Sequence, residues 1–132
     1  VPLQLLDGGS HDALAACDAT LIASGTATLE AMLFKRPMVI GYRMHALSWM
    51  LMKPMTYQPW GGLPNILSRD FVVPELMQQD CQPEALARAV LGQLDDSANA
   101  VRLTERFTEL HLLLRRDTAR RATDAIAQIL EA

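Results

Sequence analysis

The chain has 132 residues, half of them hydrophobic, which is enough for one domain with its own core. Its mild net charge of −3 argues against a general nucleic-acid-binding protein, for which a basic face is expected. No run approaches the ~20 apolar residues of a membrane span, and the two cysteines follow no metal or redox spacing, which favours reduced structural thiols in a cytoplasmic protein. Because the chain begins with Val rather than Met, we expect part of a larger protein.

The N-terminal third predicts alternating strands and helices. Residues 3–6 predict a strand that ends at the turn Asp7-Gly8-Gly9, where glycines allow a positive φ. Ser10 is a good N-cap for a helix over residues 12–17. Residues 20–22 predict a short buried strand, and residues 27–34 are good helix formers that end before Pro37.

The turn between this second strand and its helix contains Ser24, Gly25 and Thr26. Free backbone N–H groups and the positive end of the helix dipole at such a turn suit an anion, above all a phosphate. Gly25 allows a ligand to approach the backbone closely, and the two hydroxyls can donate hydrogen bonds. From these residues alone, an ordinary capped helix is the alternative, and the more frequent one.

The run Met38-Val39-Ile40-Gly41-Tyr42 is short and continuously apolar, as central parallel strands are. Strand, helix, strand, helix and strand in under fifty residues predict a parallel sheet with helices on its faces. Ligands bind beyond the carboxyl ends of the strands in such sheets. We therefore expect Gly8-Gly9, the Ser24 turn and Arg43 at one edge of the sheet.

Residues 45–55 are apolar nearly all round, which favours a buried helix; the alternative is a surface helix on lipid, for which Met and Trp are suited. We then expect a loop that contains Trp60, a short helix over residues 63–67, a strand over residues 71–73 and a turn at residues 74–76.

Three helices then follow, over residues 83–94, 100–115 and from 118, with apolar stripes. Core packing explains such stripes most simply, and dimerisation or docking is the alternative. The last two helices and the break between them also carry six arginines that form either a solvated face or a patch for anionic groups: Arg102, Arg106, Arg115, Arg116, Arg120 and Arg121.

Several motifs in the same order give a family resemblance. They are Leu6-Asp7-Gly8, ATLIASGTATLE over residues 19–30, PMVIGYR over residues 37–43, Leu63-Pro64-Asn65, and residues 80–83. Together they closely resemble the C-terminal half of the lipid A disaccharide synthase family, over essentially the whole chain. The resemblance implies an α/β, Rossmann-like parallel sheet with flanking helices, the sugar-nucleotide half of a B-type glycosyltransferase, ending in an all-helical tail. Residues 1–94 would form the UDP-sugar-binding domain and residues 95–132 a helical extension that packs on it, or on a partner domain or protomer.

The resemblance also implies site residues. Ser24, Gly25, Thr26 and Ala27 would cradle the diphosphate of UDP, and Glu30, one helical turn on, would accept hydrogen bonds from ribose hydroxyls. The remaining residues would shape the nucleotide pocket (Gly8, Gly9), contact sugar or phosphate (Asn65, Arg43) and contact lipid (Trp49, Met50, Met52, Lys53, Trp60).

The implied reaction joins UDP-2,3-diacylglucosamine to 2,3-diacylglucosamine 1-phosphate (lipid X) at the inner face of the inner membrane of Gram-negative bacteria. It needs neither metal nor cofactor. The catalytic base would lie in the N-terminal half, so none is expected in this chain, and a homodimer through the C-terminal helices is possible. Two alternatives are another B-type UDP-sugar transferase or epimerase, and a non-catalytic interaction module.

Overall fold

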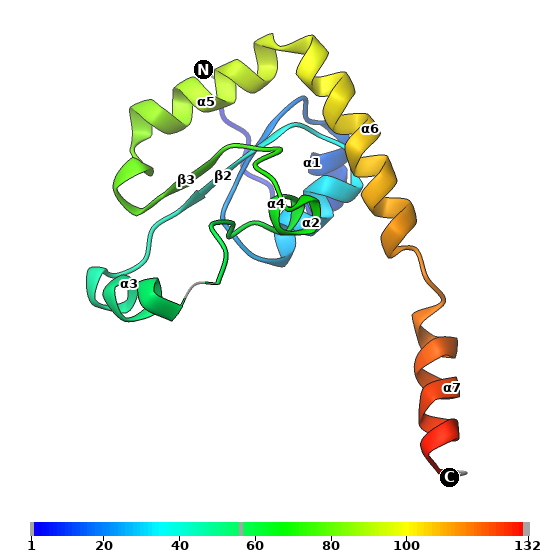
Figure 1. Ribbon diagram of the computed structural model, residues 1–132. Coiled ribbons are helices and arrows are strands. Elements are labelled where there is room, and N and C mark those ends of the chain that lie inside the picture. Colours follow the sequence, from blue (N-terminus) through cyan, green and yellow to red (C-terminus); the bar gives the residue numbers. More distant parts are fainter. Residues whose placement is uncertain (1, 56, 131–132) are drawn as a thin grey trace.

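The computed structural model describes residues 2–55 and 57–130 (Figure 1). Within them the sheet consists of β1 (Thr20–Ile22), β2 (Met38–Tyr42) and β3 (Glu75–Met77). All neighbours are parallel, in the order β1-β2-β3, with Leu21 opposite Val39 and Gly41 opposite Leu76. The predicted α/β class with a parallel sheet and flanking helices is confirmed.

Side chains of β2 alternate between two helical layers, as the period of a strand requires. Met38 and Ile40 belong to the main core, on the side of α2 (Thr26–Leu33) and α4 (Leu63–Ser68). Gly41 faces the opposite layer, where Leu86 of α5 (Pro83–Asp95) would lie 2.9 Å from a Cβ at that position. Figure 1 shows α5 on one side of the strands and α2 and α4 on the other.

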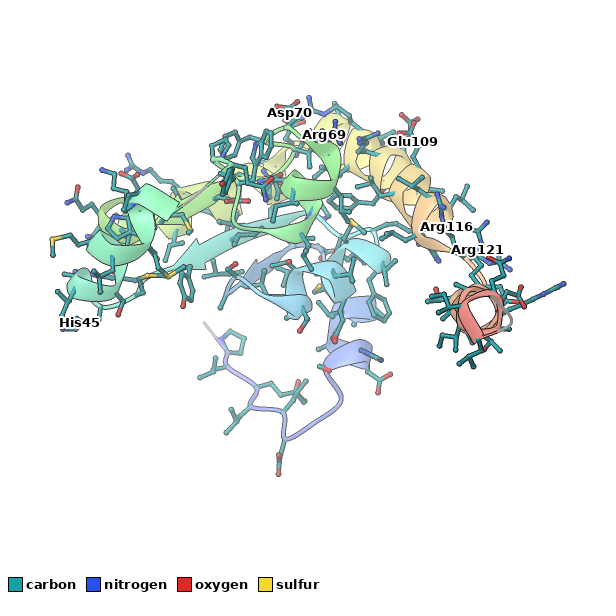
Figure 2. All side chains as sticks on the ribbon, turned by 60° about the horizontal axis from the view of Figure 1, so that its bottom comes forward. His45, Arg69, Asp70, Glu109, Arg116 and Arg121 are labelled. Atoms are coloured by element: carbon teal, nitrogen blue, oxygen red, sulfur yellow. The ribbon has the colours of Figure 1, made fainter. Side chains whose placement is uncertain are left out.

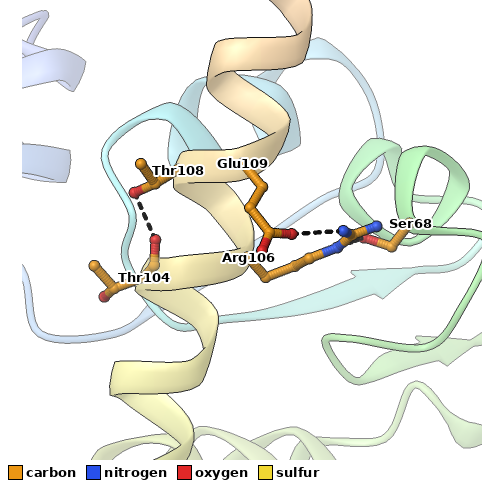
Figure 3. Close-up of polar contacts among 5 residues, drawn as sticks. All are labelled: Ser68, Thr104, Arg106, Thr108 and Glu109. Atoms are coloured by element: carbon orange, nitrogen blue, oxygen red, sulfur yellow. Dashed lines mark hydrogen bonds and ion pairs between the residues drawn. The ribbon is translucent and has the colours of Figure 1, made fainter.

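The helical extension predicted from residue 95 divides into two parts with different environments. α6 (Ser97–Leu114) places Leu103, Phe107 and Leu110 in the main core, each at most 2% exposed, as its stripe predicts. It also contacts the end of α4, since Arg106 Nε donates to Ser68 Oγ at 3.3 Å while its Nη1 donates to Glu109 Oε2 at 2.8 Å (Figure 3).

In contrast, α7 (Thr118–Leu130) stands away from the body and is exposed on every side (Figures 1 and 2). Its apolar stripe includes Ile126 and Ile129, which are 58% and 77% exposed. Core packing, the simpler prediction for the C-terminal stripes, is therefore wrong for this helix.

Two predicted strands are wrong. Residues 3–6 form no strand: the sheet of the described residues contains only β1, β2 and β3, and Leu3 and Leu5 are more than 90% exposed. The strand predicted over residues 71–73 lies instead at Glu75–Met77. The reason is a side chain: Asn65 Oδ1 accepts the N–H groups of Val72 and Val73, which removes them from ladder pairing.

The apolar segment after β2 forms α3 (Ala46–Met52) and a 3-10 turn over Lys53–Met55. It is exposed: Leu47, Met50 and Leu51 are each more than half accessible. The buried helix favoured by its composition is therefore wrong, and the surface alternative remains. Figure 1 shows α3 at one end of the molecule and α7 at the other.

The remaining elements lie close to their predicted positions. α1 (Ser10–Ala16) begins at Ser10 with Gly9 as N-cap, so the serine is inside the helix and does not cap it. α6 begins at Ser97 because the Asp96 side chain accepts from Asn99 N at 2.8 Å, which shortens the predicted break between helices. A 3-10 turn over Gln78–Asp80 joins β3 to α5.

Candidate functional site

The turn from β1 into α2 has a backbone that requires glycine. Gly25 has φ 132° and ψ −164°, a region essentially restricted to that residue. A Cβ there would meet no heavy atom within 4 Å, so the requirement is conformational and not a matter of space. Gly25, Thr26 and Ala27 are all exposed. Because the first N–H groups of a helix lack intrahelical acceptors, this turn presents donors and the positive dipole end to solvent.

Two hydroxyls attach this turn to the loop before α4. Ser24 Oγ donates to Gly61 O at 3.0 Å. Thr28, which is fully buried, donates to Gly25 O at 2.7 Å and accepts from Leu63 N at 3.3 Å. Thr28 therefore links the Gly25 carbonyl to the backbone at Leu63. It was not among the site residues predicted from the sequence. Its position three residues after Gly25, where a hydroxyl reaches back to the preceding backbone, is the signal that could have found it.

The loop is attached in turn to β3 through Glu75. The two carboxylate oxygens accept from Gly61 N and Gly62 N, each at 2.8 Å, and Asn65 Nδ2 donates to the same carboxylate at 2.8 Å. Glu75 was predicted only as part of a turn. Nothing local in the sequence marks it, because its partners lie ten to fourteen residues earlier.

Asn65 is fully buried, and its amide is occupied within the chain. Nδ2 also donates to Val73 O at 2.9 Å, while Oδ1 accepts from Val72 N at 2.8 Å and Val73 N at 3.0 Å. All the hydrogen-bonding capacity of a primary amide is thereby used. In this geometry Asn65 fixes the loop and the start of β3, and it has no group left for a sugar.

Glu30 lies one turn into α2, and its side chain is 46% exposed. His11 Nε2 is 3.5 Å from Glu30 Oε2, a contact that becomes an ion pair when the histidine is protonated. Gly8 and Gly9 have positive φ values of 85° and 68°, as predicted for a glycine turn. Since His11 follows Gly9 by two residues, this contact brings the start of α1 beside α2. Arg43 is exposed just after β2 and makes no polar contact with the Ser24 turn among the described residues.

The residues predicted to contact lipid fall into two environments. Met50, Met52 and Lys53 are exposed and Trp49 is half-buried, all on α3 or directly after it. Figure 2 shows His45, the N-cap of α3, at the extreme edge of the molecule. Trp60 lies outside this helix, half-buried, with its ring 6.3 Å from that of Phe71 in an edge-on arrangement.

Two hollows lie away from the Ser24 turn. One of about 290 Å³ lies between α4 and α6 and is lined by Ser68, Phe71, Arg102 and Arg106 among others. An open apolar one of about 770 Å³ is lined by Leu21 of β1 and by residues of α5 that include Leu86 and Val90. In the described part of the chain, no helix is long and apolar enough to cross a membrane, and no group of three or more His, Cys, Asp or Glu side chains is placed to hold a metal ion.

The arrangement is an open turn at the carboxyl end of strand β1 of a parallel sheet, with exposed residues at the start of α2, and this geometry is compatible with the family resemblance. A family model described as lipid-A-disaccharide synthetase matches residues 1–130. The chain belongs to this family. It is 58% identical to the lipid-A-disaccharide synthase of Albidiferax ferrireducens and 57% identical to that of Verminephrobacter eiseniae, over 98% and 97% of this chain and 34% of each relative. The enzyme of the same name from Thiobacillus denitrificans is 54% identical over the whole chain and 36% of its own length. The chain thus spans about a third of the length of the curated relatives it matches.

Proposed function

We propose that this chain supplies the donor-binding part of a lipid-A-disaccharide synthase. The reaction transfers diacylglucosamine from UDP-2,3-diacylglucosamine to lipid X, and it gives lipid A disaccharide 1-phosphate and UDP in lipopolysaccharide biosynthesis. The observation that carries the proposal is the Ser24-Gly25-Thr26 turn, with its glycine-only backbone, in a chain that belongs to this family.

In this proposal the diphosphate of UDP lies against the N-terminus of α2. Thr26 and Ala27 offer exposed backbone N–H groups there, and the helix dipole favours the negative charge. Charge develops on the leaving UDP in the transition state, so donors that are already oriented stabilise it without reorganisation. Neither a metal nor a cofactor is needed for this step.

The nucleoside would extend from the diphosphate toward Glu30 and the glycine turn before α1. The half-exposed carboxylate of Glu30 can accept hydrogen bonds from ribose hydroxyls, and its contact with His11 holds it on that side of α2. Gly8 and Gly9, which precede α1, would shape the wall of the pocket. Arg43, beyond the end of β2, is a further candidate for contact with phosphate.

An inverting transfer also requires a base that deprotonates the acceptor hydroxyl. We place this base in the N-terminal half of the enzyme, outside these residues. That half would also provide a second wall for the nucleotide, because Gly25, Thr26 and Ala27 lie on an open surface. A homodimer formed through the C-terminal helices would cover the exposed apolar stripe of α7.

The acylated substrates reside in a membrane, and α3 is the element that suits contact with it. Leu47, Met50, Leu51 and Met52 together present an exposed apolar surface, and the half-buried Trp49 lies on the same helix. Aromatic rings favour the membrane interface, and the lysine stem of Lys53 can extend its charge toward headgroups. We therefore propose peripheral attachment at the cytoplasmic face of the inner membrane, with α3 toward the lipid.

Isothermal calorimetry of the intact protein with UDP tests the central assignment. Binding in the micromolar to millimolar range is expected, with competition by pyrophosphate at the same site. An absence of heat at millimolar UDP, with the protein folded by circular dichroism, would rule out the cradle.

A further inference from the structure

A carboxylate outside the Ser24-Gly25-Thr26 turn, the proposed nucleotide turn, is directed at the backbone of the neighbouring loop. Glu75, on β3, accepts one hydrogen bond from Gly61 N, one from Gly62 N and one from Asn65 Nδ2, all at 2.8 Å. Hydrogen bonds to an ionised acceptor are roughly twice as strong as neutral ones. Three of them converge here on one side chain, so the position of the loop is closely determined.

The two glycines allow this approach. A Cβ on Gly62 would collide with Ile40 Cδ1 of β2 and lie 3.0 Å from Glu75 Oε1. A Cβ on Gly61 would lie 3.3 Å from Met77 Cε and 3.5 Å from Glu75 Oε2. The loop backbone therefore packs directly on β2 and β3, and its two N–H groups point at the carboxylate.

The same loop holds the nucleotide turn on both sides of Gly25. Gly61 O accepts from the Ser24 hydroxyl, and Leu63 N donates to Thr28 Oγ1, whose hydroxyl donates to Gly25 O. Glycine has access to many backbone conformations, so the one that Gly25 adopts has to be selected by its surroundings. These surroundings are the loop at residues 61–63, and the hydrogen bonds to Glu75 fix the position of its backbone.

We propose that Glu75 is a positioning residue for the donor site. It sets the Gly61–Leu63 backbone, which in turn holds the Ser24-Gly25-Thr26 turn in the geometry that receives a diphosphate. Glu75 itself touches no ligand, since its oxygens are directed at the loop. This inference rests on the proposed function, because it needs a diphosphate at that turn.

The test compares UDP affinity with fold stability in the intact protein. Glu75→Gln keeps the size of the side chain but offers one acceptor oxygen and an amide nitrogen that opposes one of the three donors. We expect a dissociation constant for UDP about tenfold higher, measured by calorimetry well below the unfolding midpoint. Faster hydrogen exchange at the Gly61 and Gly62 amides should accompany it. Glu105→Gln, which removes an exposed carboxylate on α6, is the matched control and should bind UDP as the parent does.

A second variant, Glu75→Asp, keeps the charge and shortens the reach by one methylene. It covers the case in which Glu75→Gln does not fold, and a folded Glu75→Asp protein with several-fold weaker UDP binding supports the proposal. Folded variants that bind UDP as tightly as the parent overturn it, while the nucleotide site itself stands. Failure of both variants to fold also overturns it, because Glu75 is then a residue of the fold alone. If the parent protein does not bind UDP, the proposed function fails first and this inference with it.

Discussion

Replacement of Gly25 by Ala separates backbone geometry from steric bulk at the nucleotide turn. The added methyl group meets no heavy atom within 4 Å, so its cost comes from φ 132° and ψ −164°, a region that L residues avoid. Holding such a residue there costs about 1–3 kcal/mol. If the turn keeps its shape, the free energy of unfolding falls by that amount, which is roughly 4 °C of midpoint per kcal/mol for a chain of this size. If the turn relaxes instead, the N–H groups of Thr26 and Ala27 move and the diphosphate loses its donors.

Calorimetry with three ligands distinguishes these outcomes from a general loss of the site. We expect Gly25→Ala to weaken UDP and pyrophosphate by about tenfold or more, the scale of one to two hydrogen bonds to a charged group, and to leave uridine unchanged. Gly92→Ala is the control, because that glycine lies inside α5 with open space around it. It should raise stability by about 0.5–1 kcal/mol and leave UDP binding alone. Unchanged affinity of Gly25→Ala for both phosphate ligands would refute the cradle.

Four further changes test the other assignments. Glu30→Gln should weaken UDP binding by about 1–3 kcal/mol and pyrophosphate binding much less; equal losses would contradict a ribose contact. Asn65→Ala should lower the free energy of unfolding by at least ~3 kcal/mol in denaturant titrations, because it orphans several buried backbone groups, and a loss below 1 kcal/mol would contradict its structural role. Trp49→Ala combined with Met50→Ala should reduce flotation with anionic liposomes by roughly tenfold or more, given the ~1.5–3 kcal/mol of burying one such side chain; unchanged flotation would remove α3 from the lipid contact. Ile129→Asp should shift the intact protein from dimer to monomer in sedimentation velocity if α7 forms an interface, and an unchanged distribution would argue against it.

The sequence predicted the elements whose signal is local. β2 is a continuous apolar run and is found at the predicted residues, as is the short strand β1. The position of β3 was missed because it depends on a distant residue. The Asn65 side chain takes the N–H groups of Val72 and Val73, so the ladder begins two residues further on.

Apolar periodicity also failed to tell which stripes are covered. The stripes of α6 and α7 look alike in the sequence, yet Phe107 is fully buried while Ile129 is 77% exposed. The apolar α3 resembles a core helix and lies on the surface. An apolar stripe indicates that one face of a helix favours an apolar neighbour. Which neighbour covers that face depends on tertiary packing, and the periodicity of the sequence carries no information about it.

In the motifs that carry the family resemblance, several polar side chains form hydrogen bonds within the chain. These side chains shape the site and are not free to bind a ligand. Ser24 donates to the loop, Thr28 to the turn, and Asn65 to Val73 and Glu75, while the groups left facing outward are mainly backbone N–H donors. A cradle of this kind recognises charge and shape, and it does not distinguish one nucleotide from another. Under the proposed function, selectivity for uridine and for an acylated sugar therefore comes from other parts of the site. In the proposed site, Glu30 and the Gly8-Gly9 turn are the candidates for uridine selectivity, and α3 is the candidate for contact with the acylated sugar.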